Sequence, residues 1–282
     1  MKLSDAVQRL RTLHDNTAPL FFILGPCAME SEDHTMMMAE QLAKLAEKLK
    51  FLLIFKSSFD KANRTSLGNY RSLGLQEGLR ILQRVRETFQ VPVITDVHEV
   101  CQVASVAEVA DVIQIPAFLC RQTDLLIAAG KTGKIVFIKK GQFLAPENIA
   151  GAVKKVESTG NTDVWIGERG FAFGYNDLIV DYRNFSLFKN VGKPIVFDVT
   201  HSVQKPGGLG HASGGNRALV APLAASGIAQ GIAGIFLEVH DQPEKALSDG
   251  PNSVRLSQLE DFLCYLIDLD AWAKQRPYPK LS

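Results

Sequence analysis

The sequence predicts a protein of the α/β class, a (β/α)8 TIM barrel that spans residues 1–282 as a single domain. Two observations support this prediction. Eight short apolar segments rich in Val, Ile or Phe recur along the chain, and their length is typical of strands buried on both faces. Segments with helical spacing separate them, and no linker rich in Pro, Gly or Ser interrupts the alternation. A doubly wound open sheet is the alternative, but it usually has fewer strands or a visible break.

The elements follow one another in a regular order. Residues 1–20 have the pattern of a short amphipathic helix and a turn, which we expect to form an N-terminal extension. The expected barrel strands are residues 21–27, 51–56, 91–97, 112–118, 135–140, 164–167, 194–199 and 234–239. Between strands, apolar residues recur three or four positions apart, as at Met38, Leu42, Leu45, Leu49 and at Leu75, Leu79, Leu82. A last helical pattern covers residues 256–272.

Several helix starts can be assigned from capping chemistry. The candidate N-caps, whose side-chain oxygens can accept hydrogen bonds from free backbone N–H groups, are Asp33, Thr123 and Asn176. Pro146 is expected in a first turn, where its missing N–H costs nothing. The glycine-rich segment 202–217 lacks a phosphate-loop motif, so we expect it to form a flexible lid. Residues 213–215 are candidates for the start of the seventh helix.

Composition and charge exclude several classes of protein. The 31 Lys and Arg residues nearly balance the 30 Asp and Glu residues, so the formal net charge of +1 creates no global attraction to nucleic acid or membranes. Hydrophobic residues make up 46% of the chain and charged residues 22%, as is usual in soluble enzymes. The four cysteines are widely spaced, and neither a secretory signal nor a membrane-spanning segment is recognisable. We therefore expect a cytoplasmic protein.

Polar residues gather where the expected strands end. In a barrel of parallel strands the active site lies at the carboxyl ends, because the βα loops converge there. The residues at these ends are Cys27, Glu30, Lys56, Ser57, Asp96, Gln114, Arg121, Lys139, Gln142, Glu168, Arg169, Asp198, His201, Glu238 and His240. With Lys61 and Arg64, the cations among them would surround one mouth and suit a substrate with several phosphate or carboxylate groups. The alternative is that each cation forms a separate surface ion pair.

Four residues that are distant in sequence form a candidate metal site. Cys27, His201 and Glu238 belong to the first, seventh and eighth strands, which become neighbours when a barrel closes. With Asp249 they would offer sulfur, nitrogen and oxygen ligands, which suit Zn²⁺, Fe²⁺, Mn²⁺ or Co²⁺ better than Ca²⁺. The alternatives are that Cys27 is a buried apolar residue and that Asp249 begins an Asp-Gly turn.

Nine short motifs resemble a known enzyme family. They are GPCAMES (25–31), FKSSFDKANRTS (55–66), DVHE (96–99), QIPAFLCRQTDLL (114–126), KKGQF (139–143), ERG (168–170), DVTHSVQ (198–204), EVH (238–240) and SDG (248–250). In this order, over roughly residues 20–260, they resemble the 3-deoxy-D-manno-octulosonate-8-phosphate synthases. The resemblance implies a (β/α)8 barrel, commonly a homotetramer, that condenses phosphoenolpyruvate with D-arabinose 5-phosphate and water and releases inorganic phosphate. The product serves lipopolysaccharide synthesis.

The resemblance also implies a role for individual residues. Phosphoenolpyruvate would be held by Lys56, Ser57, Gln114, Lys139, Arg169 and His201. The pentose phosphate would be held by Lys61, Asn63, Arg64, Thr65 and Asp96, with Arg121 reaching it from a neighbouring subunit. The residues expected to act most directly in catalysis are Lys56, Asp96, Lys139, Arg169 and His201. Cys27 implies the metal-dependent class of the family, with His201, Glu238 and Asp249 as the other ligands of a divalent metal.

The sequence leaves three other functions as alternatives. The related 3-deoxy-D-arabino-heptulosonate 7-phosphate synthases use erythrose 4-phosphate and typically carry a KPRTS-like element, whereas residues 61–65 here are KANRT. Asn63 offers an extra hydrogen-bonding partner for the longer pentose, which favours the octulosonate enzyme. A Schiff-base aldolase would use Lys139 or Lys56 to form an imine. A non-catalytic sugar-phosphate binding barrel would keep the cations but should lack the four metal ligands.

Overall fold

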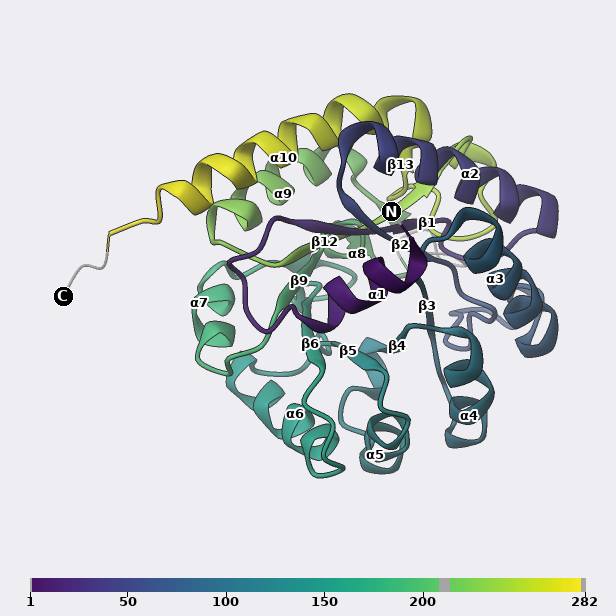
Figure 1. Ribbon diagram of the computed structural model, residues 1–282, viewed down its shortest axis with the longest axis horizontal. Coiled ribbons are helices and arrows are strands. Elements are labelled where there is room, and N and C mark those ends of the chain that lie inside the picture. Colours follow the sequence, from purple (N-terminus) through teal and green to yellow (C-terminus); the bar gives the residue numbers. More distant parts are fainter. Residues whose placement is uncertain (1, 208–213, 280–282) are drawn as a thin grey trace.

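The computed structural model describes residues 2–207 and 214–279, and a closed barrel of parallel strands forms its centre (Figure 1). The barrel strands are β1 (Phe21–Gly25), β2 (Leu52–Lys56), β3 (Val93–Asp96), β4 (Val112–Ile115), β5 (Ile135–Lys139), β6 (Val164–Glu168), β9 (Ile195–Asp198) and β12 (Gly234–His240). Each strand pairs in parallel with the next, and β12 pairs with β1, with Phe21 opposite Gly234. The closure confirms the predicted (β/α)8 barrel and rules out the open sheet.

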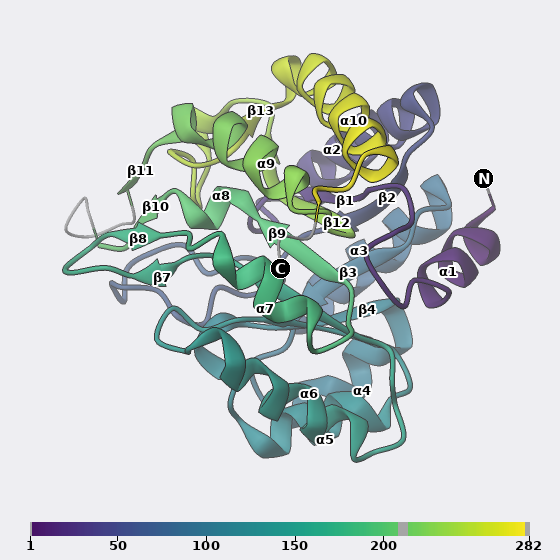
Figure 2. The same ribbon diagram turned by 90° about the vertical axis from the view of Figure 1, so that its left-hand side faces the viewer.

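The two ends of the barrel are covered differently. Helix α1 (Leu3–Arg11) lies at the amino end, where its buried residues Ala6 and Leu10 join the apolar cluster inside the barrel. Two small antiparallel hairpins lie at the opposite end (Figure 2). They pair β7 (Phe171–Ala172) with β8 (Leu178–Ile179), and β10 (Gln204–Lys205) with β11 (Gly214–Gly215). The amino end is therefore closed by apolar side chains, which leaves the carboxyl end for a site.

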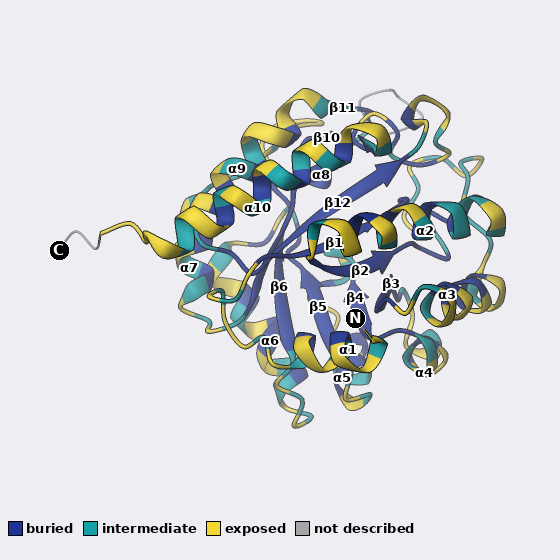
Figure 3. Ribbon diagram, turned by 45° about the horizontal axis from the view of Figure 1, so that its top comes forward, coloured by how far each residue is buried: buried dark blue, intermediate teal, exposed yellow. Residues whose placement is uncertain are grey.

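A ring of helices surrounds the strands. These helices are α2 (Glu32–Leu49), α3 (Leu75–Phe89), α4 (Val100–Val109), α5 (Thr123–Lys131), α6 (Ile149–Glu157), α7 (Arg183–Lys189), α9 (Val220–Ala229) and α10 (Leu259–Gln275). The strands are buried throughout, whereas each helix buries only the side that faces them (Figure 3). Successive strand residues point to opposite faces, so Phe21 packs inside the barrel and Phe22 packs between the strands and the helices.

Shorter elements complete the connections. They are the helix α8 (Val199–Ser202), the strand β13 (Val254–Arg255), and the 3₁₀ turns η1 (Ala117–Leu119), η2 (Pro146–Asn148), η3 (Arg217–Leu219), η4 (Pro243–Lys245) and η5 (Leu256–Gln258). Strand β13 extends the sheet beside the end of β12. In the described part of the chain, no helix combines the length and the apolar character that crossing a membrane requires.

Capping chemistry located the helix starts only approximately. Pro146 occupies the first turn as predicted, in η2 just before α6. Ser31 rather than Asp33 caps α2, because its Oγ accepts the backbone N–H three residues later at 3.1 Å. The prediction for Thr123 is also wrong by one position, since Thr123 is the first residue of α5 and Gln122 is its N-cap. In both cases a neighbouring polar residue occupies the extended backbone conformation that an N-cap requires.

Two further predictions fail because short antiparallel hairpins were not foreseen. Asn176 does not cap a helix; it lies in the turn between β7 and β8 with φ 54°, and α7 starts seven residues later at Arg183. Gly214 and Gly215 form β11, and α9 starts only at Val220. Residues 208–213 of the expected lid, Ser213 among them, lie outside the described residues.

Gly25 allows the ends of β1 and β2 to approach each other closely. A Cβ atom at this position would lie 1.9 Å from the carbonyl oxygen of Lys56, a distance that no side chain tolerates. Just beyond the strands, the backbone N–H of Ser58 donates to the carbonyl oxygen of Cys27 at 3.3 Å. The close approach therefore puts Cys27 beside Lys56, whose Nζ donates to the Cys27 carbonyl oxygen at 2.9 Å.

Candidate active site

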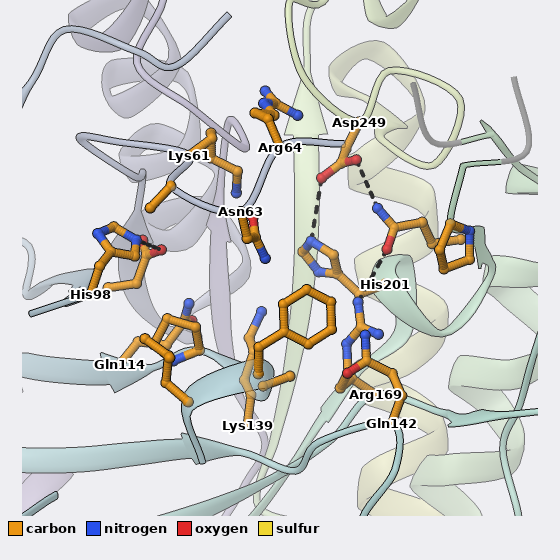
Figure 4. Close-up of a pocket in the computed structure, with 18 of the residues that line it drawn as sticks. Lys61, Asn63, Arg64, His98, Gln114, Lys139, Gln142, Arg169, His201 and Asp249 are labelled. Carbon is orange, nitrogen blue, oxygen red and sulfur yellow. Dashed lines mark hydrogen bonds and ion pairs between the residues drawn. The ribbon is translucent and has the colours of Figure 1, made fainter. Parts of the chain in front are cut away.

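A cavity of about 460 Å³ opens at the carboxyl ends of the barrel strands. The predicted site residues that line it are Lys56, Lys61, Asn63, Arg64, Thr65, Asp96, Gln114, Lys139, Arg169, His201 and Asp249. The labelled side chains among them come from different βα loops and point toward one common space (Figure 4). The structure thus brings together cations that are separated by more than a hundred residues in the sequence.

The four predicted metal ligands also come together. One ligand atom from each of Cys27, His201 and Glu238 lies within 4.8 Å of the other two. The fourth residue, Asp249, places Oδ2 3.0 Å from Cys27 Sγ and 3.4 Å from His201 Nε2. Closing of the barrel between β12 and β1 makes this possible, since Cys27 follows β1 and Glu238 lies on β12.

The chemistry of this cluster fits a divalent metal. Glu238 is fully buried, and its Oε2 has no hydrogen-bond partner among the described residues. Burial disfavours the charged form of Asp249, but its contacts with His201, Lys61 and Cys27 together outweigh burial and hold the pKa of Asp249 well below its usual value. A thiol, an imidazole and two carboxylates in a buried site prefer a borderline-soft transition metal, whereas Ca²⁺ and Mg²⁺ prefer oxygen alone.

Asp198 fixes the orientation of His201. Its carboxylate lies 2.9 Å from His201 Nδ1 and 2.6 Å from Lys139 Nζ. Burial alone would lower the pKa of His201, but the charge and hydrogen bond of Asp198, together with the hydrogen bond of Asp249, outweigh burial and raise the pKa to about 10. With Nδ1 bonded to Asp198, the Nε2 atom is directed toward Asp249 and Glu238. Such a carboxylate–histidine pair is the usual support of a metal-binding imidazole.

Arg169 is held in the cavity from two sides. Its Nη2 donates to Gln204 Oε1 at 3.2 Å, and Gln204 Nε2 donates to Asp249 Oδ1 at 2.9 Å, which joins the cation to the metal ligands. Behind it, the buried carboxylate of Glu168 accepts the backbone N–H groups of Arg169 and Gly170 at 2.9 and 2.7 Å. The Nη1 atom of Arg169 is buried without a partner in the described structure, so it is free to bind a ligand.

The other side of the cavity has its own unpaired polar atoms. Asp96 Oδ2 lies 2.9 Å from His98 Nε2, while Asp96 Oδ1 and Gln114 Oε1 are buried and have no partner among the residues described. Arg64 donates through Nε to the Tyr70 carbonyl oxygen at 2.8 Å and leaves Nη2 buried and unpaired in the same set of residues. Because buried polar groups in proteins are nearly always hydrogen-bonded, this surface is built to bind a polar ligand.

Two predicted substrate-binding residues do not line the cavity of the single chain. Ser57 is fully buried and donates through Oγ to the Pro26 carbonyl oxygen at 3.0 Å, which supports the turn after β1. Arg121 is exposed, and its carbonyl oxygen accepts a hydrogen bond from Lys155. The substrate contacts expected for these two residues stay predictions.

Sequence reasoning assigned no role to several residues of the site. They are His98, Gln204, Phe236 and Ser248, of which Phe236 places its ring 3.7 Å from Lys139 Nζ and Ser248 places Oγ 2.9 Å from Cys27 Sγ. Alternation along a strand would have indicated Phe236, since it lies two positions before Glu238 and faces the same side. Gln204 and Ser248 belong to the motifs DVTHSVQ and SDG, but nothing in the sequence indicated which atoms they contact.

Comparison with known proteins agrees with this geometry. The DAHP synthetase I family matches residues 6–275. A protein of Syntrophotalea carbinolica named 2-dehydro-3-deoxyphosphooctonate aldolase is 52% identical over 256 residues, which cover 91% of this chain and 92% of the relative. Proteins of the same name from a Cyanothece species and from Geotalea uraniireducens are each 54% identical, and cover 88% and 91% of this chain and 91% and 94% of their own lengths.

Proposed function

The chain belongs to the DAHP synthetase I family, and we propose that it condenses phosphoenolpyruvate with D-arabinose 5-phosphate and water. The products are 3-deoxy-D-manno-octulosonate 8-phosphate and inorganic phosphate, and the enzyme is a transferase of lipopolysaccharide synthesis. Relatives that are 52–54% identical over about nine-tenths of the chain carry the name of this activity, which disfavours the heptulosonate reaction. The observation that carries the proposal is the cation-lined cavity directly above the cluster of Cys27, His201, Glu238 and Asp249.

Phosphoenolpyruvate is assigned to the side of the cavity that Lys139 and Arg169 form. Both cations are almost fully buried, and burial lowers the pKa of each, so a phosphate or carboxylate group here would restore the lost solvation. Lys56 and His201 also line the cavity, and Gln114 joins them from the wall that it shares with Asp96. Ser57 supports it through the turn after β1.

The pentose phosphate is assigned to the loop after β2. Lys61, Asn63, Arg64 and Thr65 line the cavity there and offer two cations and two neutral hydrogen-bonding groups. The Asp96 carboxylate faces them from β3 and can accept hydrogen bonds from sugar hydroxyls, because its Oδ1 has no partner in the described residues. Burial opposes the charge on Asp96, but His98 and the nearby lysines outweigh it and keep its pKa well below the usual value.

In the reaction, carbon C3 of phosphoenolpyruvate attacks the aldehyde carbon of the pentose, and water adds at C2. The resulting hemiketal phosphate then expels inorganic phosphate. The substrates repel each other, so the first task of the cationic wall is to hold both in line. Lys139 and Arg169 stabilise charge on the phosphate and carboxylate groups, since they are positioned before the substrate arrives.

We assign a divalent metal, Zn²⁺, Fe²⁺, Mn²⁺ or Co²⁺, to Cys27, His201, Glu238 and Asp249. When bound, it would supply Lewis-acid polarisation of the aldehyde or orientation of the water. Asp198 keeps the His201 ring directed toward the ligand cluster. Lys56 Nζ donates to Glu238 at 3.1 Å and so fixes one oxygen of that carboxylate.

The proposal extends to a homotetramer in the cytoplasm, in which Arg121 reaches the pentose phosphate of a neighbouring subunit. Exposed aromatic side chains on neighbouring βα loops support an interface at the carboxyl end; they are Phe118, Phe143, Phe171, Phe173 and Tyr175. Arg121 is exposed close to Phe118 in the sequence. Sedimentation analysis of the whole chain measures the assembly, and a monomer with full activity would contradict the shared site.

One assay tests the substrate and the metal together. Phosphate release is measured with phosphoenolpyruvate and either arabinose 5-phosphate or erythrose 4-phosphate, with and without a chelator. We expect release only with the pentose and loss of activity after chelation, whereas the variant Cys27→Asn keeps some activity that no longer depends on metal. Full activity after chelation, with negligible residual metal, would contradict the metal assignment. Equal rates with the tetrose would favour the heptulosonate reaction, and a borohydride-trapped adduct would favour a Schiff base.

A further inference from the structure

Two polar residues at strand ends have no part in the reaction described above. Glu30 lies in the turn after β1 and His240 ends β12, and neither residue lines the cavity. The two contact each other, because His240 Nε2 lies 3.2 Å from Glu30 Oε1. The backbone N–H of Gln242 donates to His240 Nδ1 at 3.0 Å, so Nδ1 is an acceptor and the ring donates to Glu30 through Nε2. Both nitrogens of His240 are therefore engaged, and the ring links two segments of the chain.

The same oxygen of Glu30 also holds the loop that follows β12. Glu30 Oε1 accepts the backbone N–H of Leu247 at 2.8 Å. The next two residues of this loop reach Cys27, since Ser248 Oγ lies 2.9 Å and Asp249 Oδ2 lies 3.0 Å from Cys27 Sγ. Cys27 and Glu30 belong to one short segment, so this segment and the loop are joined at two places, once at the metal ligands and once at Glu30.

His240 is itself held in place by the start of α2. His34, in the first turn of that helix, packs against it with the two ring centroids 4.6 Å apart. His34 Nε2 lies 3.0 Å from Asp241 Oδ1, which ties the helix to the end of β12. The position of the His240 ring is therefore fixed on the side away from Glu30 as well.

The backbone of Asp249 depends on contacts on both sides of it. Its φ of 50° lies in the left-handed region, which residues other than glycine adopt only where their surroundings hold them. After it, the backbone N–H groups of Asn252 and Ser253 both donate to its carbonyl oxygen at 3.1 Å. Before it, the hydrogen bond between Leu247 and Glu30 holds the chain. Loss of Glu30 would leave the chain before Asp249 without this contact.

We propose that Glu30 is a positioning residue for the divalent metal site of the proposed function, because it holds Cys27 and Asp249 at ligating distance from each other. Glu238 lies two positions before His240 on β12, so the contact between His240 and Glu30 also ties the segment of a third ligand to the same carboxylate. Residues that support metal ligands without touching the metal typically change metal affinity by about 10- to 100-fold.

Titration of the metal-free whole chain with Co²⁺ tests the proposal, because the Cys27 thiolate gives a sulfur-to-cobalt charge-transfer band when it binds the ion. Glu30→Ala should weaken Co²⁺ binding at least about tenfold. Glu30→Gln keeps the accepting oxygen and should weaken it less than about threefold. The matched control is Glu32→Ala, which removes a carboxylate from the first turn of α2 that pairs with Arg80 and Arg84 on the surface, and it should leave the affinity unchanged.

A second variant removes the other partner of the hydrogen bond. Leu247→Pro deletes the donated N–H and leaves Glu30 in place. The exchange suits the loop, because the Leu247 side chain is exposed and Ala246 has a ψ of 132°, as the residue before a proline prefers. Leu247→Pro should also weaken Co²⁺ binding. The double variant Glu30→Ala/Leu247→Pro should bind no more weakly than Glu30→Ala, because both changes remove the same contact.

Several outcomes would overturn the proposal. Glu30→Ala could bind Co²⁺ as tightly as the unmodified chain, Glu30→Gln or Glu32→Ala could lose as much affinity as Glu30→Ala, or the losses in the double variant could add. If Glu30→Ala does not fold, Leu247→Pro decides in its place, and unchanged affinity there would count against Glu30. Absence of the charge-transfer band in the unmodified chain would overturn the metal assignment itself, and this role of Glu30 with it.

Discussion

Two adjacent lysines at the end of β5 occupy two different regions of the molecule. Lys139 points into the cavity, where its Nζ lies 2.6 Å from Asp198 and 3.7 Å from the centre of the Phe236 ring. Lys140 points the other way, into the layer outside the barrel, where its Nζ lies 3.6 Å from Glu168 and 3.3 Å from the Gly141 carbonyl oxygen. Both are buried, so the alternation of a strand alone gives the two lysines different surroundings.

The two regions differ in how completely their polar groups are paired. Around Lys139, atoms such as Arg169 Nη1 and Gln114 Oε1 have no partner in the described residues, which leaves them for a ligand. Around Lys140, the Glu168 carboxylate accepts two backbone N–H groups and the side-chain amide of Asn184 at 2.9 Å. We infer that the inner region is built for binding and the outer region for rigidity, and the following variants test this division.

The largest effect is expected from Lys140→Met. Breaking a fully buried ion pair leaves the Glu168 charge uncompensated, which costs about 3–5 kcal/mol of folding free energy. The folded fraction should keep its KM for both substrates within about threefold, since no atom of Lys140 lines the cavity. Urea unfolding measures the loss. The double variant Lys140→Met/Glu168→Gln should recover part of it, and no recovery would mean that the ion pair is not the cause.

The matching variant on the inner face is Lys139→Met. Loss of one preorganised charge at a reacting group typically lowers kcat by about 10²–10³. Asp198 keeps His201 as a partner, so the free energy of unfolding should fall less than in Lys140→Met. Phosphate release and urea unfolding are measured on the same preparation. If Lys139→Met lost as much stability as Lys140→Met and kept its kcat, the inference that the inner region serves binding and the outer region serves rigidity would be contradicted.

A smaller effect is expected from Phe236→Leu, which removes the ring beneath Lys139. A cation over a buried ring gains about 0.5–2 kcal/mol, so kcat/KM for phosphoenolpyruvate should fall several-fold. The apolar volume is largely kept, which limits the cost to folding to about 1.5 kcal/mol. Steady-state kinetics with each substrate varied in turn is the measurement. A fall in kcat/KM for the pentose phosphate alone would show that the Phe236 ring does not act on the binding of phosphoenolpyruvate.

The smallest effect on activity is expected from Asn184→Ala, on the outer face. The Glu168 carboxylate loses one hydrogen bond at Oε2, which costs about 1.5–3 kcal/mol, while both backbone N–H groups still reach Oε1. The temperature of thermal unfolding should fall and kcat should not change. A kcat loss above about tenfold would instead make Asn184 a positioning residue for Arg169.

The strands and their ends were predictable, whereas the finer features were not. Buried strands of a parallel barrel have continuous apolar runs, and this signal located the eight barrel strands and the polar residues that follow them. The hairpins contain strands of two residues, which are too short to have a period, so Asn176 and Gly214 were misassigned. The predicted helix caps were wrong by one or two positions. At α2, Ser31 has a capping ability similar to that of Asp33, whereas at α5 the cap position is taken by Gln122, whose side chain makes no capping hydrogen bond.

Candidate site residues were recognised when they followed long strands and belonged to recognisable motifs. Gln204 and Ser248 act through contacts with residues that are distant in the sequence, and no pattern along the chain records such contacts. Likewise, His34 has the sequence context of an ordinary helix start, and only the fold puts it beside His240. The resemblance singled out Lys139 and not Lys140, and the register of β5 supplies the physical reason, because it decides which of the two lysines faces inward.

The carbonyl oxygen of Lys56 occupies the space that a side chain at position 25 would need, and this restricts which substitutions the protein can accept there. The residue with the least tolerance for replacement need not be one that reacts or binds. Gly25 has no functional group, yet even Gly25→Ala would force apart the two chain segments that carry Cys27 and Lys56. A screen for inactive variants should therefore recover substitutions of Gly25 as well as substitutions of the charged residues. Second mutations that restore activity to a Gly25 variant should lie close to residue 56.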